Sequence, residues 1–319
     1  MKMRLMSKLL ITTLLTSSII TLGCSKEPTA KRDQNSSEKV AQKPVGKKSA
    51  PKKEKLTTEQ KNQKRILEYV KRAISVNRDY ALKGIRIRQV KDVKDLPGWK
   101  VYFLDIDLKI KKQQGKEITV HDKIFSNGKY IVRDFINIVN RSSLKDKLVP
   151  DMDKSYYRKD HLVYGRESAP NKIVVFSDPI CPFCQGYLPG LLKAAKENPD
   201  KIALYYYHFP LIMLHKEAPT IIKAAMVAEK RGMKDVMEKV YAQKFNLDTA
   251  DEKKILEAFN KAMGTQITSK DIHAKDIEAR YAFDKEMADK MMISGTPTVY
   301  VNGKKDFSRR KYQEIIKKK

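Results

Sequence analysis

Apolar residues in the first third of the chain follow a helical pattern and then an alternating one. The spacing of Thr57 and Gln60 is that of a capping box, in which each side chain caps a backbone group at a helix start. The apolar residues that follow at helical spacing are Ile66, Val70, Ala73, Ile74 and Ala81. They predict one helix that ends near Gly84. The strand-like runs after it cover residues 85–90, 99–110, 116–125 and 129–139.

These elements predict a small α+β domain over residues 57–140. Ser126, Asn127 and Gly128 lie between the last two runs and are typical of a hairpin turn. The residues of this domain form no catalytic constellation. The segment 141–157 that follows is mostly polar, contains Pro150, and is predicted to link this domain to the next.

The second half of the chain mixes apolar runs of strand length with helical patterns. Strands are predicted at residues 173–176 and 202–209, with a helix at 186–198 between them. Three helical stripes follow, formed by Met233, Val236, Met237, Val240 and Tyr241, by Ile255, Leu256, Phe259 and Met263, and by Ile277, Tyr281, Ala288 and Met291. We interpret these stripes as core-facing rather than as a ligand site. Final strands are predicted at 298–301 and 304–307, with a short basic helix after Ser308.

The N-terminus has the pattern of a targeting segment. Three basic residues precede an apolar run over residues 9–22, which is too short to span a membrane comfortably, so residues 1–23 are predicted to be a signal peptide. The sequence Thr21-Leu22-Gly23-Cys24 resembles a bacterial lipobox, although Thr21 stands where leucine is usual. The resemblance implies cleavage after Gly23 and a lipid on Cys24. An ordinary secreted protein and an uncleaved anchor are the alternatives, and each places the chain outside the cytoplasm, where disulfides persist.

The segment 24–56 is polar and rich in Lys, Ser, Gln and Pro, so it cannot bury enough apolar surface to fold. We expect a flexible tether between the lipid anchor and the folded part. The chain as a whole carries a formal charge of +28, but the excess is spread along it and no nucleic-acid-binding motif accompanies it. A solvated basic surface, attracted to anionic membrane lipid, is the simpler reading.

The main chemical motif is Cys181-Pro182-Phe183-Cys184. It follows a predicted strand and opens a predicted helix, where unpaired backbone N–H groups favour an anion such as a thiolate. Pro182 suits the first helical turn, and Cys184, one turn in, is expected to be the more buried thiol and to act as the resolving one. A zinc site needs about four ligands, and the third cysteine, Cys24, lies in the processing site. An inert structural disulfide remains as the other alternative.

A second motif, Thr296-Pro297, stands directly before the strand predicted at 298–301. Together with Cys-Pro-Phe-Cys it resembles the thioredoxin superfamily, in which a cis-proline packs against the cysteine ring. The run from His161 to Pro170 and the run from His208 to Leu211 resemble the DsbA-like group. The resemblance implies an α/β thioredoxin-like fold over residues 158–319 with a helical insertion at about 211–293, preceded by the small α+β domain. The position and hairpin of the 57–140 module are similar to the dimerisation domain of DsbC and DsbG proteins, which implies a homodimer.

The resemblance also implies roles for single residues. Cys181 would attack or be attacked, Cys184 would resolve, Pro182 and Phe183 would tune the pair, and Thr296 and Pro297 would hold the client backbone. One departure concerns the buried acid that relays protons in many relatives, since Val175 occupies its position. Asp178 is expected nearer the surface loop and unable to replace that acid.

The implied function is extracytoplasmic thiol–disulfide exchange on envelope or secreted proteins, at the periplasmic side of a bacterial membrane. The Thr296-Pro297 pair and the N-terminal module slightly favour isomerase or reductase work, whereas the helical insertion and Cys-Pro-Phe-Cys suit a DsbA-like oxidase. The expected partners are client proteins with cysteines and a membrane redox partner, not nucleic acid. No cofactor is expected beyond the redox-active Cys181–Cys184 pair.

Two other functions remain open. A non-catalytic binding or chaperone lipoprotein would keep the disulfide as structure, and a basic polymer-binding protein would retain nucleic acid in a salt-dependent way. No Gly-rich phosphate loop appears in the sequence. The five histidines, which are His121, His161, His208, His215 and His273, show no metal spacing and are expected on the surface or packed in the core.

Overall fold

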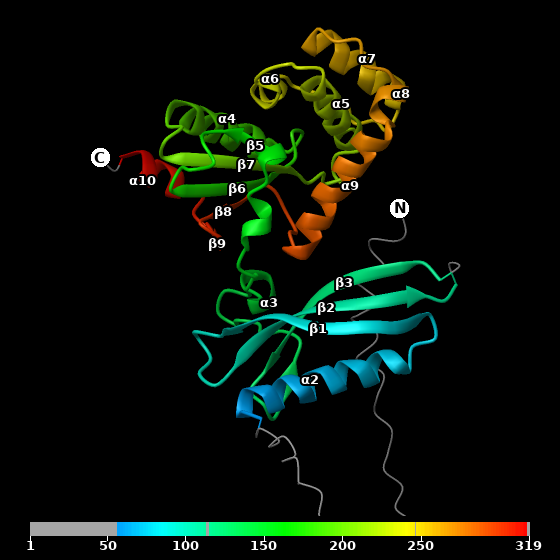
Figure 1. Cartoon of the computed structure of the whole chain (residues 1–319), viewed down its shortest axis with the longest axis vertical. Coiled ribbons are helices and arrows are strands. Elements are labelled where there is room, and N and C mark those ends of the chain that lie inside the picture. The colour runs from blue at the N-terminus through cyan, green and yellow to red at the C-terminus, as the bar shows by residue number, and fades with distance from the viewer. Residues whose placement is uncertain (1–55, 113–114, 246, 318–319) are drawn as a thin grey trace, which may run out of the picture. The chain divides into compact units, whose positions relative to one another are not determined.

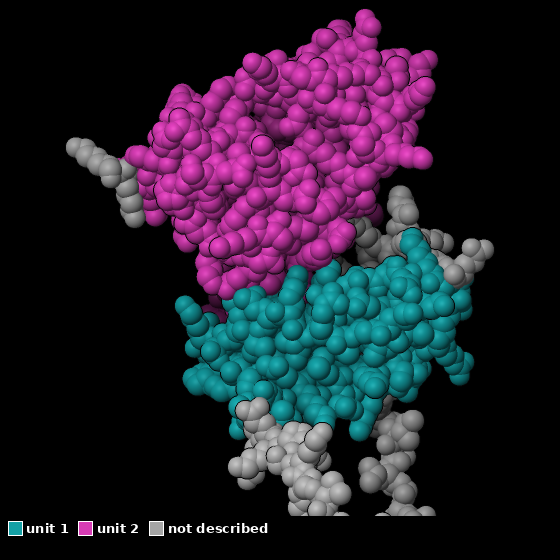
Figure 2. Space-filling model, in the orientation of Figure 1, with its two compact units in different colours: residues 1–131 teal, residues 132–319 magenta. Residues whose placement is uncertain are grey.

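A computed structural model describes residues 56–112, 115–245 and 247–317 of the chain. It divides into two units, and the boundary falls between Ile131 and Val132. Figure 2 colours unit 1, residues 1–131, teal and unit 2, residues 132–319, magenta.

Unit 1 is one helix packed on an antiparallel sheet. Helix α2 (Thr58–Ser75) is followed by strands β1 (Tyr80–Asp92), β2 (Lys100–Ile110), β3 (Glu117–Ser126) and β4 (Ile131–Val132), in sheet order β1-β2-β3-β4. The predicted capping box is confirmed: the Thr57 hydroxyl accepts from Gln60 N, and the Gln60 side chain accepts from Thr57 N at 2.8 Å. The helix buries Ile66, Val70 and Ile74 against one face of β2 and β3.

Two expectations for this region are wrong. The helix ends at Ser75, and Ala81 and Gly84 belong to β1, because the side chain of Asn77 accepts the N–H groups of Asp79 and Tyr80 and turns the chain out of the helix. The strand expected at 129–139 is reduced to Ile131–Val132. Beyond it, Asn137 accepts backbone N–H groups of its own loop, which competes with a strand ladder.

Unit 2 is built around a mixed sheet. Its strands are β5 (Leu162–Tyr164), β6 (Asn171–Ser177), β7 (Ile202–His208), β8 (Thr298–Val301) and β9 (Lys304–Lys305), in the order β5-β7-β6-β8-β9. Strands β6 and β7 run parallel, while β8 is antiparallel to β6. The last strand is shorter than the predicted 304–307. This architecture confirms the predicted α/β thioredoxin-like fold class.

Side chains alternate across this sheet and form two cores. On one face, Ile173 and Val175 of β6 pack under α4 (Pro182–Glu197) and α10 (Lys311–Lys317). On the other face, Val174 and Phe176 pack with the end of α9 (Lys275–Lys290) and with the short helix η1 (Lys154–Tyr156). The cysteine motif begins α4, so the first face carries the candidate site (Figure 1).

The helical insertion lies between β7 and β8. It contains α5 (Ala218–Lys230), α6 (Val236–Ala242), α7 (Glu252–Met263), α8 (Ser269–Ile272) and the start of α9, grouped at one side of the sheet in Figure 1. The predicted stripe of Ile255, Leu256, Phe259 and Met263 is buried in a core of the insertion itself, as expected for a core-facing helix.

The segment predicted as a linker is largely packed. It contains α3 (Leu144–Lys147) and η1, and η2 (Lys159–His161) follows it. Val149, Met152 and Tyr156 are buried in the core of unit 2, and Met152 N donates to the carbonyl of Gly303 at 2.9 Å. The domain boundaries proposed from the sequence stay a prediction.

Candidate active site

The end of β6 and the start of α4 position the two cysteines. Strand β6 ends at Ser177, and a short turn brings Cys181 to the N-cap of α4 with φ −65° and ψ 122°. Cys181 N donates to the carbonyl of Asp178 at 3.1 Å, and the Cys181 carbonyl accepts from Cys184 N at 2.9 Å. Pro182 occupies the first helical turn, where its missing N–H leaves no bond unmade. The backbone therefore holds both sulfurs at the start of one helix.

The two thiols are free and differ in burial. Cys184 is 0% exposed and Cys181 is 3% exposed, so the expected order of burial holds. Phe183 between them is 74% exposed. A disulfide that approaches from solvent meets Phe183 and the edge of Cys181 before it can reach Cys184.

The second predicted motif lies beside the first. The peptide bond between Thr296 and Pro297 is cis, as the resemblance implied. The Cys181 sulfur lies 3.7 Å from the carbonyl oxygen of Thr296, at the long limit of an S–H···O contact. The structure thus brings Cys181, Thr296 and Pro297 together across more than a hundred residues of sequence. The role of Thr296 and Pro297 in holding a client stays a prediction.

Asp178 is not near the surface, and that expectation is wrong. The residue is 0% exposed. Its carboxylate accepts from Ile180 N at 2.8 Å and from Leu211 N at 2.8 Å, and His215 Nδ1 lies 2.8 Å from Oδ2. A buried carboxylate is stable where several donors replace its hydration. Asp178 therefore ties the turn before Cys181 to the loop that enters the helical insertion.

Cys184 sits in an environment that opposes its ionisation. Burial raises the pKa of the Cys184 thiol above its ordinary value, and the neighbouring Cys181 adds to that rise. The Ser177 hydroxyl, the Thr296 hydroxyl and the backbone N–H of Asp178 act in the opposite direction, because each can donate to a thiolate. The Thr296 hydroxyl is buried and makes no hydrogen bond to any of the described residues. The resolving sulfur is thus deeply buried, and two hydroxyls and one backbone N–H lower its pKa in part.

A chain of buried hydroxyl groups continues from Ser177. Ser177 Oγ lies 2.7 Å from the hydroxyl of Tyr241, which lies 2.7 Å from the hydroxyl of Tyr206. Burial raises the pKa of both tyrosines well above the ordinary value, so their hydroxyls keep their protons. The three residues come from β6, α6 and β7. The helical insertion therefore contributes a side chain to the surroundings of the cysteines.

The sequence analysis did not identify this series of buried hydroxyl groups. Strand alternation carried a partial signal, because Val175 and Ser177 share a face of β6, and Tyr206 pairs in register with Val175. Tyr241 was placed in the core but not beside a cysteine, since no pattern in the sequence says where α6 packs. Val175 itself is buried in the same core as both cysteines, as an apolar side chain without a proton to give.

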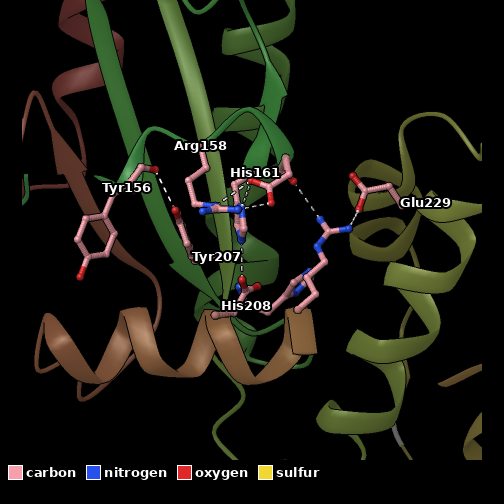
Figure 3. Close-up of polar contacts among 9 residues, drawn as sticks. Tyr156, Arg158, His161, Tyr207, His208 and Glu229 are labelled. Atoms are coloured by element: carbon pink, nitrogen blue, oxygen red, sulfur yellow. Dashed lines mark hydrogen bonds and ion pairs between the residues drawn. The ribbon is translucent and has the colours of Figure 1, made fainter. Parts of the chain in front are cut away.

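A second buried polar network lies in unit 2 (Figure 3). His161 Nε2 is 2.6 Å from Asp284 Oδ1, and its Nδ1 is 2.9 Å from Asp160 Oδ1. The His161 ring stacks on Tyr207 with centroids 4.2 Å apart. The other oxygen of Asp284 accepts from His208 N at 2.9 Å. This network joins η2, β7 and α9 and contains no thiol.

Two residues of that network, Asp160 and His208, have pKa values well below their ordinary ones. Arg158 donates to both oxygens of the Asp160 carboxylate, which lowers the pKa of Asp160 well below its ordinary value. Burial, with smaller contributions from Arg280 and His161, lowers the pKa of His208 well below its ordinary value. His208 is therefore neutral. Each ring nitrogen of His161 faces a carboxyl oxygen, of Asp160 on one side and of Asp284 on the other.

Within the described ranges, no group of three or more His, Cys, Asp or Glu side chains could hold a metal ion. A search of the same residues for a helix long and apolar enough to cross a membrane finds none. Cys24, its lipobox and the predicted tether lie outside the described residues.

The chain is similar to several known proteins. A family model described as Thioredoxin matches residues 158–318. The chain is similar to the Bacillus cereus protein named Probable disulfide bond formation protein D, with 28% identity over 148 residues, which cover 44% of this chain and 68% of that protein. It is also similar to Na(+)/H(+) antiporter NhaA 1 of Mycolicibacterium gilvum, with 28% identity over 152 residues, which cover 46% of this chain and 24% of that protein. The chain thus spans about a quarter of the antiporter's length.

Two solved structures are also similar. BdbD from Bacillus subtilis in its oxidised form shares 20% sequence identity at a TM-score of 0.40, over 53% of this chain and 98% of that chain. DsbA2 from Pseudomonas aeruginosa shares 23% sequence identity at a TM-score of 0.35, over 46% of this chain and 84% of that chain.

Proposed function

Because this chain belongs to the thioredoxin superfamily and is a Dsb-type thiol–disulfide oxidoreductase of that superfamily, we propose that Cys181 and Cys184 carry its dithiol–disulfide exchange. The observation that supports this most is the pairing of an N-cap thiol with a fully buried one beside the Thr296-Pro297 loop. Cys181 is the nucleophile in this proposal. It lies at the N-cap of α4 and is the less buried of the two thiols.

The exchange proceeds in two steps. The Cys181 thiolate attacks one sulfur of a client disulfide, the client S–S bond breaks, and the second client sulfur leaves with the electron pair and takes up a proton. Cys184 then loses its proton and attacks the Cys181 sulfur, which releases the remaining client thiolate. The client has gained two electrons and two protons, and Cys181–Cys184 has become a disulfide. The reverse sequence oxidises a client dithiol.

Thr296 and Pro297 hold the client in this proposal. The Thr296 carbonyl lies against the Cys181 sulfur, so an extended client segment that pairs with the Thr296 backbone would carry its own sulfur to Cys181. Phe183 is 74% exposed and offers an apolar contact at the same place. Pro182 and Phe183 are the residues whose substitution should shift the reduction potential of the pair.

The direction of exchange is proposed as isomerase or reductase work on envelope or secreted proteins, with DsbA-like oxidation as the alternative. Unit 1 supports the first direction if it makes the protein a homodimer, because two active sites then face one client and raise the local concentration of thiolate. The helical insertion supports the second. A lipid on Cys24 would hold the protein on the periplasmic side of a bacterial membrane, near a membrane redox partner.

Trapping of mixed disulfides tests the assignment of the two cysteines. Cys184→Ala should accumulate covalent complexes with client proteins, because the second step is lost while the first survives. Cys181→Ala should form none. Complexes are read by electrophoresis without reductant and by mass spectrometry of the linked peptides. Equal trapping by both variants would contradict the assignment of Cys181 as the nucleophile.

A shortened chain tests the proposed direction. The chain should begin at residue 132, where the two units divide, and be compared with the mature protein carrying Cys24→Ser. Rescue of a scrambled disulfide substrate should fall in the shortened chain, while oxidation of a reduced peptide survives. Light scattering should show a dimer for the longer protein and a monomer for the shorter. A monomeric longer protein, or equal rescue by both, leaves the oxidase reading ahead.

Mass spectrometry of the envelope protein tests the anchor. The mature protein should begin at Cys24 with a diacylated terminus, and Cys24→Ala should release or misprocess it. An unmodified terminus at another residue would refute the lipid anchor without touching the exchange chemistry.

A further inference from the structure

The second step of the exchange faces a physical obstacle at Cys184. This thiol is 0% exposed, and it must become a thiolate before it can attack Cys181. A buried anion without compensating donors is costly. Val175, also 0% exposed, supplies an apolar side chain on the same face of β6. The stabilisation has to come from other groups.

The acid nearest in sequence is already engaged. Asp178 precedes Cys181 by one turn, but both of its carboxylate oxygens accept hydrogen bonds, one from Ile180 N and the other from Leu211 N and His215. Both oxygens are therefore occupied by donors from the turn and from the loop before the helical insertion. The group of Asp178 that lowers the pKa of Cys184 is its backbone N–H.

We infer that Ser177, Tyr241 and Tyr206 form a hydroxyl network that stabilises the thiolate of Cys184 during the resolving step. Ser177 lies on the face of β6 that packs in the core with Cys184, and its hydroxyl lowers the pKa of that thiol. The two tyrosines act through it as positioning residues. Their hydroxyls follow one another at 2.7 Å and 2.7 Å, and all three residues are buried, at 0%, 6% and 3% exposure. The inference rests on the proposed exchange at Cys181 and Cys184.

The order of donation follows from the charge. When Cys184 is a neutral thiol, the Ser177 hydroxyl is free to donate toward Tyr241. When Cys184 is a thiolate, Ser177 turns its O–H to the sulfur, Tyr241 donates to Ser177, and Tyr206 donates to Tyr241. Each bond in such a chain polarises the next. Since the hydroxyls only rotate, the network responds to the charge without gaining or losing a proton.

The resolving step balances without a further reactant. Cys184 enters as a thiol, and its proton ends on the client sulfur that leaves Cys181. The Cys181–client S–S bond breaks and the Cys181–Cys184 S–S bond forms, so no net electron is gained or lost in this step. The hydroxyl network lowers the free energy of the thiolate between these two states.

Ellman's reagent separates the two steps in one experiment. The full chain carrying Cys24→Ser has Cys181 and Cys184 as its remaining cysteines. In the reduced protein, attack by Cys181 releases the first coloured thiolate at a rate proportional to the reagent concentration. Ring closure by Cys184 releases the second at a rate independent of that concentration. The rate of the second phase is measured as a function of pH.

Removal of the Ser177 hydroxyl should shift the second phase alone. Loss of one hydrogen bond to a charged sulfur reduces the thiolate population about tenfold, which moves the pH profile of the second phase up by about one pH unit. A more basic thiolate is also a better nucleophile, so Ser177→Ala should slow the second phase only about threefold at neutral pH. At high pH the same variant should close the ring faster than the unsubstituted protein. The first phase should stay within about twofold, because the attacking thiol is unchanged.

Tyrosine variants supply a graded series with a matched control. Tyr241→Phe and Tyr206→Phe keep the ring and remove the hydroxyl, so both should shift the profile in the same direction as Ser177→Ala, Tyr241→Phe by more. Tyr207→Phe is the control, since Tyr207 is equally buried and its hydroxyl donates to the Tyr156 carbonyl on the other face of the sheet. A network that served only packing would change the stability of these variants without moving the profile.

Two outcomes would overturn the inference. If Ser177→Ala and Tyr241→Phe both give a second-phase profile that overlays the profile of Tyr207→Phe, the hydroxyls do not stabilise the thiolate. If the unsubstituted protein shows no concentration-independent phase at all, Cys184 does not resolve, and the proposed exchange fails together with this role. Should Ser177→Ala fail to fold, Tyr241→Phe, which loses one oxygen and no carbon, decides the question.

Discussion

Unit 2 contains two buried polar networks that are built from different chemistry. Beside Cys184 the groups are neutral hydroxyls, on Ser177, Tyr241 and Tyr206. Around His161 the imidazole lies between two carboxyl groups, and Asp160 also forms an ion pair with Arg158. A buried carboxyl group must keep its hydrogen-bond donors at all times, because leaving it uncompensated is costly. Neutral hydroxyls can hydrogen-bond to one another while the thiol is neutral, and one of them can donate to the sulfur when the thiol ionises.

Strand β7 contributes side chains to both networks. Successive residues of β7 point to opposite faces of the sheet, so Tyr206 joins the hydroxyl network while Tyr207 stacks on His161. The hydroxyl of Tyr207 donates to the Tyr156 carbonyl, and the Tyr156 hydroxyl donates to the carbonyl of Met287 in α9. The ionic side therefore fastens helices to the sheet, whereas the hydroxyl side surrounds the group that reacts.

The largest effect should come from breaking the ionic network. Asp284→Ala leaves His161 and the N–H of His208 without their shared acceptor in a site that is 0% exposed. We expect a loss of about 3–5 kcal/mol in the free energy of unfolding, measured by urea denaturation of the reduced protein. The rate of ring closure by Cys184 should stay within about twofold, because no group at the sulfur changes.

Asp200 provides the control for that substitution. Its ion pair with Arg166 is on the surface, with the Asp200 side chain 70% exposed, so Asp200→Ala should cost less than about 1 kcal/mol. If Asp284→Ala costs no more than Asp200→Ala, the His161 network contributes no more than a surface pair and the comparison fails.

Asp178 should give the next largest effect, because it is a buried carboxyl group with three donors, next to the thiols. Asp178→Ala removes an acceptor from Ile180 N, Leu211 N and His215 at once. Water can enter the space left by the side chain and replace the acceptor in part, so the three losses do not add. We expect a total loss of about 2–3 kcal/mol, near the value of one hydrogen bond to a charged group.

The same variant should also slow the first attack by Cys181. The turn 178–180 sets the start of α4, and Cys181 N is bonded to the Asp178 carbonyl. The rate of the first Ellman phase measures the attack by Cys181. For Asp178→Asn this rate should lie between those of Asp178→Ala and the unsubstituted protein, because one acceptor oxygen remains. An unchanged first phase in Asp178→Ala would show that the turn is held without its carboxylate.

The sequence predicted the elements that depend on local pattern. The capping box at Thr57, the alternation of β6 and the helix start at Pro182 each follow from neighbouring residues. The errors arose where a polar side chain bonds to its own backbone. Asn77 ends α2 early, and Asn137 holds a loop where a strand was expected. Such short-range bonds compete with periodicity and are weakly marked in a single sequence.

The residues of the candidate site also differ in whether a local motif identifies them. Cys181, Cys184, Thr296 and Pro297 could be named because they form motifs whose spacing is itself informative. The burial of Asp178 could not, because its donors come from Leu211 and His215 in a distant loop. Tyr241 reaches the cysteines through the packing of α6 on α4, which depends on the whole helical insertion. Residues that act through tertiary placement carry no signature of their own.

The pH dependence of stability should separate the reduced from the oxidised protein. The pKa of Cys184 is raised in the folded state, so the folded protein keeps this proton when the unfolded chain, with a cysteine pKa of about 8.5, has lost it. The stabilisation from this group is complete below about pH 8.5 and is lost as the pH rises toward the folded-state pKa. The slope should approach about 1.4 kcal/mol per pH unit at most.

Urea denaturation between neutral and alkaline pH measures this slope. The oxidised protein has no Cys184 thiol to titrate, and Cys184→Ala in the reduced protein should remove the same part of the slope. A reduced protein whose stability is as flat as that of Cys184→Ala over this range would mean that Cys184 ionises as easily folded as unfolded, contrary to its burial.

The smallest effect should come from the far end of the hydroxyl chain. Tyr206→Phe removes one neutral hydroxyl and keeps the ring that fills the core beside Val175 and Leu204. Tyr241 loses one partner but keeps Ser177, so we expect a loss of about 0.5–1.5 kcal/mol in the free energy of unfolding. Tyr207→Phe, which also removes one buried hydroxyl, should cost a similar amount. The two networks therefore differ through their charges and not through their depth. If Tyr206→Phe lowered the free energy of unfolding as much as Asp284→Ala, the two networks would contribute equally to stability. That result would contradict the distinction between the two sides of the sheet.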